Sequence, residues 1–133
     1  MKTKDIKQTI IFPISPEKLY SLLLSSKLMS DIHQGKTTMS KRANGKFIVF
    51  DGYCHGQNIE LIDGKKIVQA WHFNEEGWPD DHFSVCTFLL ERKAKGTKLT
   101  FTQTDVPSTT YDALKEGWHT YYWKPIAEYL DNK

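Results

Sequence analysis

The chain has 133 residues, 39% of them hydrophobic and 26% charged, and a formal net charge of +2. This length fits one domain, and this balance is typical of a folded globular protein and excludes a disordered one. The mean hydropathy is −0.52, and no apolar run approaches the roughly 20 residues that a membrane-spanning helix needs. We therefore expect a single domain over residues 1–133 without a membrane span.

The first third of the chain predicts a strand followed by two short helices. Residues 4–12 read as a strand that Pro13 closes. Ser15 is a typical N-cap residue, and Pro16 suits a first helical position because its missing amide is not needed there. Hydrophobic residues at helical spacing favour a second short helix over residues 26–32.

From residue 37 onward the pattern changes to that of strands joined by tight turns. Asn44-Gly45, Asp63-Gly64 and Lys95-Gly96 indicate hairpins, because these residue types tolerate positive φ. Asp51-Gly52 and His55-Gly56 mark further turns or bulges. The expected strands that these turns delimit cover residues 46–50, 58–62, 67–73, 83–91 and 98–104.

The carboxyl-terminal segment predicts one long helix. Thr109 with Asp112 resembles a capping box. Pro125 removes the amide that would bond the carbonyl of Tyr121, so we expect a kink there. One face of the helix carries a broad stripe of mainly aromatic residues: Tyr111, Leu114, Trp118, Tyr122 (or Tyr121), Pro125 and Tyr129.

The order of elements predicts an α+β fold. The strands form a curved, seven-stranded antiparallel sheet, two short helices follow the first strand, and the long helix covers the sheet. In the last strand Leu99, Phe101 and Gln103 share one face. A single helix laid across a curved sheet leaves space between them, and aromatic side chains line that space.

Short motifs carry a family resemblance. They run in order along nearly the whole chain: Ser15-Pro16-Glu17-Lys18-Leu19-Tyr20, Gly45-Lys46-Phe47, Phe50-Asp51-Gly52, Ile59-Glu60-Leu61, Lys66-Ile67-Val68-Gln69-Ala70-Trp71, Trp78-Pro79, His82-Phe83-Ser84, Gly96-Thr97-Lys98-Leu99, Val106-Pro107, Gly117-Trp118, Tyr121-Tyr122-Trp123 and Pro125. Together they resemble the START-like (SRPBCC) superfamily. More narrowly, they resemble the homologues of the activator of the heat shock protein 90 ATPase.

This resemblance implies the helix-grip fold, in which a sheet wraps around a long carboxyl-terminal helix. It also brings two classes of partner into consideration, a small hydrophobic ligand and a chaperone. In the complete eukaryotic activator a separate amino-terminal domain precedes this module. Some relatives on the same fold are cyclases or aromatases, but a shared fold does not by itself assign a function.

Aromatic residues make up 13% of the chain, and such side chains either fill a core or line an apolar pocket. Both interpretations stay open. His119 and Tyr122 are the candidates for a polar contact that orients a ligand. The full set of candidate ligand-binding residues is Phe50, Trp71, Phe88, Phe101, Trp118, His119 and Tyr122.

We expect no catalytic residue, no metal and no cofactor. The chain has no nucleophile or phosphate-binding motif, and none of its five histidines makes a metal-ligand spacing with another. Glu75, Glu76, Asp80 and Asp81 crowd one loop, which is more typical of a hydrated acidic loop than of a cation site. A cyclase-like or hydrolytic enzyme that uses His119 or Tyr122 is the least favoured alternative.

Charge is unevenly divided along the chain. Residues 1–46 hold nine basic and three acidic residues, whereas residues 47–133 hold nine basic and thirteen acidic ones. The basic part lacks interleaved aromatics, so nucleic acid is not expected, and a solvated face or an acidic protein partner is favoured. Cys54 and Cys86 have no CxxC spacing, which indicates reduced thiols in a cytoplasmic protein.

Two hypotheses therefore precede the structure. The first is a non-catalytic domain that binds a small hydrophobic or amphipathic ligand between the sheet and the last helix. The alternative is a stand-alone interaction module that acts as a co-chaperone of heat shock protein 90, motivated by the charge division. The sequence makes no prediction of oligomeric state.

Overall fold

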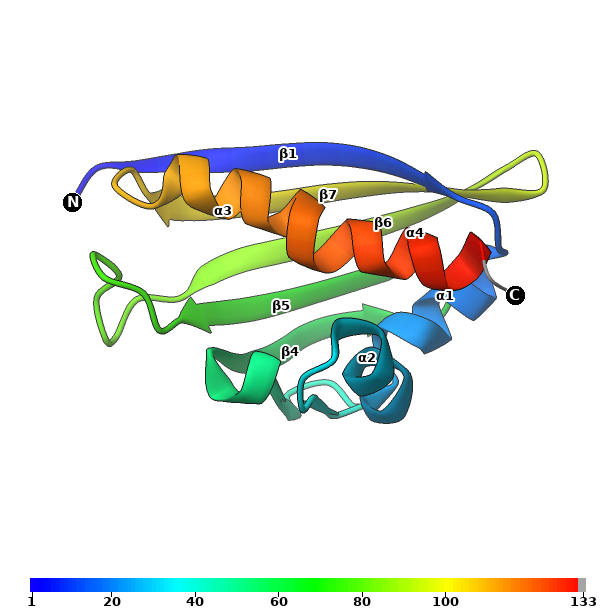
Figure 1. Ribbon diagram of the computed structural model, residues 1–133, viewed down its shortest axis with the longest axis horizontal. Helices are drawn as coiled ribbons and strands as arrows, with labels where there is room; N and C mark the ends of the chain where they lie inside the picture. The colour runs from blue at the N-terminus through cyan, green and yellow to red at the C-terminus, as the bar shows by residue number, and fades with distance from the viewer. Residues whose placement is uncertain (132–133) are drawn as a thin grey trace.

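The computed structural model describes residues 1–131 and places one long helical run across one face of an antiparallel sheet (Figure 1). The strand order is β1-β7-β6-β5-β4-β3-β2, and every neighbouring pair is antiparallel. The expected seven-stranded sheet is confirmed. The strands are β1 (Thr3–Phe12), β2 (Thr38–Met39), β3 (Lys46–Val49), β4 (Cys54–Ile62), β5 (Lys66–Phe73), β6 (Ser84–Lys93) and β7 (Gly96–Pro107).

The two short helices follow β1 as the sequence predicts. In α1 (Pro16–Leu23) the Ser15 hydroxyl accepts the Lys18 amide at 3.2 Å. In α2 (Ser26–His33) the preceding Ser25 hydroxyl accepts an amide in the same way, at 3.1 Å. These caps satisfy amides that the first helical turn leaves unpaired. The helix α2 packs against β2 and the end of the carboxyl-terminal helix, so its last turn faces the helix–sheet space.

The predicted turn at His55-Gly56 is wrong, because both residues lie inside β4, which begins at Cys54. Gly56 marks a close approach of neighbouring strands. A Cβ atom placed there would lie 1.9 Å from the Ala70 carbonyl oxygen and 2.5 Å from the Phe47 ring. A glycine can therefore mark a close approach of strands within a sheet as well as a turn. The turn at Asp51-Gly52 is confirmed as part of the 3₁₀ segment η1 (Phe50–Gly52).

The carboxyl-terminal helical run has three parts, α3 (Tyr111–Gly117), a π-helical segment η2 (Trp118–Trp123) and α4 (Lys124–Asp131). The predicted capping box is wrong: Thr110 occupies the cap, and its hydroxyl donates to the Pro107 carbonyl at 3.1 Å instead. Helical geometry changes just before Pro125, where the Lys124 amide bonds the His119 carbonyl five residues back. The missing amide of proline is accommodated by this wider turn.

The wider turn decides which aromatic residues face the sheet. Trp118, Tyr122 and Trp123 are 5%, 3% and 2% exposed, whereas Tyr121 is 67% exposed. In a regular α-helix the fourth and fifth residues after Trp118 would diverge around the axis. The π-helical turn brings both to the buried side.

Buried tryptophans are joined to glutamines. The indole Nε1 of Trp118 donates to Gln103 Oε1 on β7 at 2.7 Å, and that of Trp123 donates to Gln8 Oε1 on β1 at 2.8 Å. Trp71 donates to Gln69 within β5 at 2.8 Å. Because a buried N–H without a partner is costly, the bonds of Trp118 and Trp123 fix the height and rotation of the helix over the sheet.

Replacing Gln103 with leucine tests this anchor. The Gln103 Nε2 also donates to the Ser84 hydroxyl at 2.7 Å, so Gln103→Leu leaves two buried polar partners unpaired. We expect the free energy of unfolding in urea to fall by roughly 1–3 kcal/mol. The control Thr102→Val, on the other face of β7, should change it by less than about 0.5 kcal/mol. A Gln103→Leu protein as stable as the parent would contradict this assignment.

Candidate functional site

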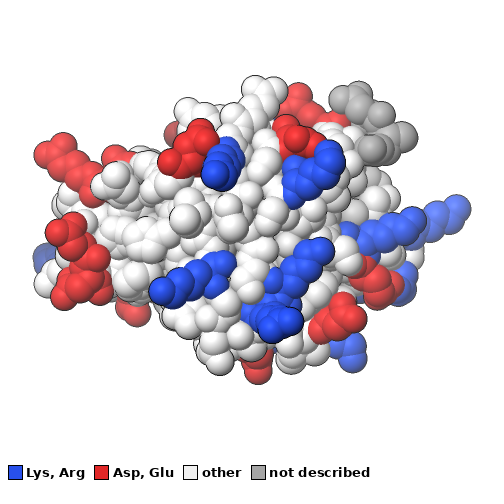
Figure 2. All heavy atoms as spheres, turned by 90° about the horizontal axis from the view of Figure 1, so that it is seen from below, with Lys and Arg blue, Asp and Glu red and all other residues white. Residues whose placement is uncertain are grey.

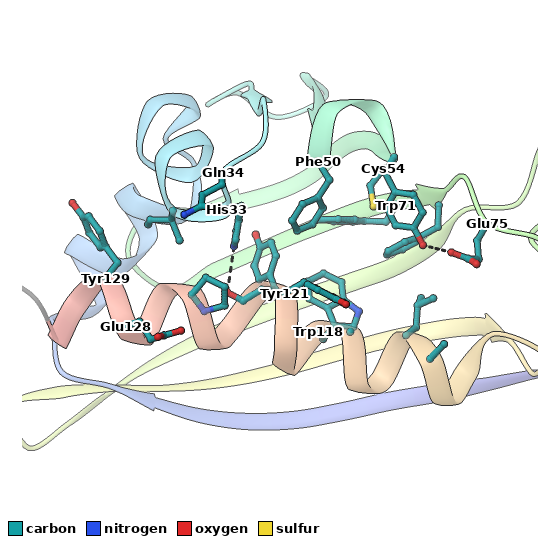
Figure 3. A pocket seen from close by; sticks show the side chains of 18 of the residues that line it. His33, Gln34, Phe50, Cys54, Trp71, Glu75, Trp118, Tyr121, Glu128 and Tyr129 are labelled. Atoms are coloured by element: carbon teal, nitrogen blue, oxygen red, sulfur yellow. Dashed lines mark hydrogen bonds between the residues drawn. The ribbon is translucent and has the colours of Figure 1, made fainter.

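A cleft of about 830 Å³ lies beneath the carboxyl-terminal helix (Figure 3). One wall is the helical run, the opposite wall is the end of α2 with η1, and β4 and β5 close it from below. Its lining residues are Asp31, Ile32, His33, Gln34, Phe50, Tyr53, Cys54, Trp71, Phe73, Glu75, Ala113, Leu114, Gly117, Trp118, Tyr121, Tyr122, Pro125, Glu128 and Tyr129.

Aromatic rings form the inner surface of the cleft. Alternation along β5 directs Trp71 and Phe73 to the covered face of the sheet, where their rings stack with centroids 5.6 Å apart. Trp118 from the helix meets the Trp71 ring edge-on at 5.1 Å, and Tyr122 meets Trp118 at 4.8 Å. These rings pack on one another, are at most 6% exposed, and form the inner end of the cleft.

His33 ends α2 at the rim of the cleft. Its ring stacks on Tyr122 at 4.7 Å and contacts Phe50 at 5.1 Å, and its Nε2 lies 3.3 Å from the Tyr122 backbone carbonyl. Burial lowers the pKa of His33, against a smaller opposite effect of that carbonyl. The neutral imidazole therefore donates through Nε2, and its buried Nδ1 has no hydrogen-bond partner among residues 1–131.

At the other end of the cleft the Tyr53 hydroxyl donates to the Glu75 carboxylate (Figure 3). Burial, and then this carboxylate, raise the pKa of Tyr53. Burial likewise raises the pKa of the Cys54 thiol and of the Tyr122 phenol. These three groups stay protonated at neutral pH, so the cleft offers hydrogen-bonding groups and apolar surface rather than a thiolate or phenolate nucleophile.

Four of the predicted ligand-binding residues line the cleft: Phe50, Trp71, Trp118 and Tyr122. Phe88 and Phe101 do not. They are 2% and 0% exposed and pack beneath Trp118, with the Phe101 ring 4.3 Å from it. Both interpretations of the aromatic residues thus hold, for different rings: some fill the core and others line the cleft.

His119 lies outside the cleft. It is exposed and borders a groove beside β1, together with Gln8 and Trp123. It projects from the helical run toward solvent, whereas its neighbour Trp118 is buried against the sheet. His33, Tyr53 and Glu75 were not predicted as ligand-binding residues. Their sequence signal is only that they lie at or near the end of a helix or strand, with Glu75 in the acidic loop.

The described part of the chain, residues 1–131, contains no group of three His, Cys, Asp or Glu side chains that could hold a metal ion. Glu75 from the acidic loop is engaged by Tyr53. Cys54 and Cys86 are buried free thiols. No helix within residues 1–131 has the length and apolar character needed to cross a membrane.

Known proteins resemble this chain both in sequence and in fold. The family model described as "Activator of Hsp90 ATPase homolog 1-like protein" matches residues 13–131. The chain is 29% identical over 123 residues to "Activator of 90 kDa heat shock protein ATPase homolog 1" from Homo sapiens, covering 92% of this chain and 35% of that protein. It is 24% identical over 129 residues to "Activator of 90 kDa heat shock protein ATPase homolog 2" from Mus musculus, covering 97% and 38%. The chain thus spans little more than a third of the length of these relatives.

Solved structures share the fold over nearly the entire chain. The crystal structure of an HSP90 activator from Plasmodium falciparum has a TM-score of 0.87 at 22% identity, covering 96% of each chain. The solution structure of the Aha1 dimer from Colwellia psychrerythraea has a TM-score of 0.79 at 20% identity, also covering 96% of each chain. At such identities the likeness shows the fold.

The buried neutral His33 makes stability depend on pH. Its folded-state pKa is lowered, so the unfolded chain takes up a proton first, near a pH of about 6.5. Stability is therefore retained above that pH and falls as pH drops toward the lowered folded-state pKa. Urea unfolding should show that the free energy of unfolding falls less between pH 7.5 and 5.5 for His33→Phe than for the parent protein. The same loss in both proteins would contradict this, and exposed His119→Phe is the control.

Proposed function

Because the chain belongs to the Activator of Hsp90 ATPase homolog 1-like family, we propose that it is a non-catalytic START-like binding domain. It takes a small hydrophobic or amphipathic molecule into the cleft between the sheet and the carboxyl-terminal helix. The observation that carries this proposal is the open cleft of about 830 Å³ with tryptophan rings on its inner surface. Pockets of this size and lining are those that drug-sized ligands occupy.

The chemistry of the lining supports a passive role. A ligand's apolar body would rest against the inner end of the cleft, where Trp71 and Trp118 pack on each other and their indole N–H groups are already bonded to Gln69 and Gln103. These N–H groups therefore need no partner from the ligand, and the ring faces offer apolar surface. Burying about 200 Å² of such surface contributes about 5 kcal/mol before the cost of immobilising the ligand. Micromolar to millimolar affinity is the expected range for a small probe.

Filling the cleft from the helix should weaken ligand binding. Ala113 lines the cleft from α3, so Ala113→Trp would occupy space that a ligand needs. With the neutral probe N-phenyl-1-naphthylamine, isothermal titration should show binding to the parent and an affinity at least about tenfold lower for Ala113→Trp, which is about 1.4 kcal/mol. The matched control is Thr120→Trp, on the same helical run but outside the lining residues. Equal affinities in all three proteins would overturn the proposal.

The second candidate function, a co-chaperone of heat shock protein 90, is favoured by the names of the relatives and by a basic surface. The segment that follows α2, up to and including the first residue of β3, carries exposed Lys36, Lys41, Arg42 and Lys46, here called the basic edge. Figure 2 shows several basic side chains on one face of the molecule, with acidic side chains at the left end and also beside the basic ones near the top and the lower right. Complementary charge speeds the encounter of protein partners. This role would place the chain in the cytoplasm.

Charge reversal tests the co-chaperone role. We expect the parent to bind heat shock protein 90 from the same organism at low salt, and to bind less as salt rises. The double variant Lys41→Glu with Arg42→Glu should bind several-fold more weakly, measured by surface plasmon resonance. Its control reverses two exposed basic residues of the β6–β7 hairpin, Lys93 and Lys95. Absence of binding at low salt would remove this candidate and leave the ligand proposal untouched.

A further inference from the structure

The charged side chains that line the cleft are all carboxylates: Asp31, Glu75 and Glu128. Within residues 1–131, neither lysine nor arginine lines it. Asp31 is paired with Lys27, whose Nζ lies 3.1 Å from its carboxylate. Glu75 and Glu128 make no ion pair within the described residues. The cleft therefore carries a net negative charge, although the chain as a whole is positive.

These two carboxylates flank the aromatic surface. Figure 3 shows Glu75 at one end of the cleft and Glu128 toward the other, with the rings of Phe50, Trp71 and Trp118 between them. The face of an aromatic ring carries negative electrostatic potential and attracts cations, most strongly for tryptophan. Carboxylates and ring faces thus contribute the same sign of potential along the cleft.

The Glu75 end brings the two features closest together. The Tyr53 hydroxyl holds the Glu75 carboxylate, and the Tyr53 ring contacts Phe73 at 6.1 Å. Phe73 stacks on Trp71 and lies 6.4 Å from Trp118. A positioned carboxylate beside several rings resembles the aromatic cages that bind quaternary ammonium groups.

The remaining titratable groups that face the cleft do not oppose this potential. His33 is neutral because burial lowers its pKa, and its N–H is directed at a backbone carbonyl. Tyr122 is 3% exposed and lines the cleft. Burial raises its pKa, so its neutral hydroxyl remains a hydrogen-bonding group. An anionic ligand would meet the unpaired carboxylates of Glu75 and Glu128 and no lysine or arginine among the described residues that line the cleft.

We propose that the cleft selects organic cations, that is, ligands with an apolar body and an amine or quaternary ammonium group that lies near Glu75. This inference rests on the proposed ligand-binding function and adds the charge of the ligand to it. The apolar body occupies the ring-lined part of the cleft, and the cationic group lies between the Glu75 carboxylate and the neighbouring ring faces.

Three probes with one shared body test the charge preference: 4-phenylbutyltrimethylammonium, 4-phenylbutanol and 4-phenylbutanoate. Isothermal titration at low salt should rank the cation first and the anion last. The cation should bind at least about threefold more tightly than the alcohol, and that ratio should shrink as sodium chloride is added.

The variant Glu75→Gln separates charge from structure, because the glutamine oxygen can still accept the Tyr53 hydroxyl. It should bring the affinity for the cation close to that for the alcohol, and should change the alcohol's own affinity much less than the cation's. Glu76→Gln, at an exposed neighbour outside the lining residues, is the matched control and should keep the preference. Glu128→Gln measures the contribution of the other end and should reduce the ratio as well.

The outcomes separate the two proposals. Equal binding of all three probes, or a cation preference that survives Glu75→Gln and Glu128→Gln together, overturns the charge inference and leaves the ligand-binding function standing. No binding of any probe, together with no binding of the neutral naphthylamine, overturns both. Tighter binding of the alcohol than of the cation also overturns the inference.

Discussion

The hydrogen bond between the Trp118 indole and Gln103 is the contact on which the rest of the site depends. It joins the carboxyl-terminal helix to the centre of β7 and is buried at both ends. A hydrophobic contact alone would let the helix slide over the sheet, because such contacts are not directional. A buried donor with one acceptor within reach allows one position. About one helical turn after Trp118, the hydrogen bond from Trp123 to Gln8 fixes the helix to β1 in the same way.

The helix is anchored over β7 and β1. On the same face of the sheet, the cleft therefore lies over the strands farther from that edge. One helix cannot cover seven strands, and the gap over β4 and β5 is only partly filled by α2 and η1. Trp71 and Phe73 line that gap because their strand directs them to the covered face. Neighbouring members of one aromatic cluster thus have different positions. Phe101 and Trp71 are both fully buried, but only Trp71 lines the inner end of the cleft.

Charge divides the molecule into two kinds of surface. The cleft contributes carboxylates and ring faces, whereas the basic edge beyond β3 contributes lysine and arginine. These surfaces suit different partners, so a small ligand and a chaperone need not compete for the same residues. The proposals for the cleft and for the basic edge can therefore succeed or fail independently.

Sequence alone determined the order of elements, because periodicity, Ser15 with Pro16, and the Asn-Gly and Asp-Gly turns act locally. It also placed Gln103 on the face shared with Leu99 and Phe101. Local patterns misjudged Gly56, Thr109 and His119, since a close strand approach, a cap and a helix face depend on what packs nearby. Only the tertiary structure decided which rings line the cleft and brought His33 and Glu75 to it, because these residues meet through pairings between segments far apart in the chain.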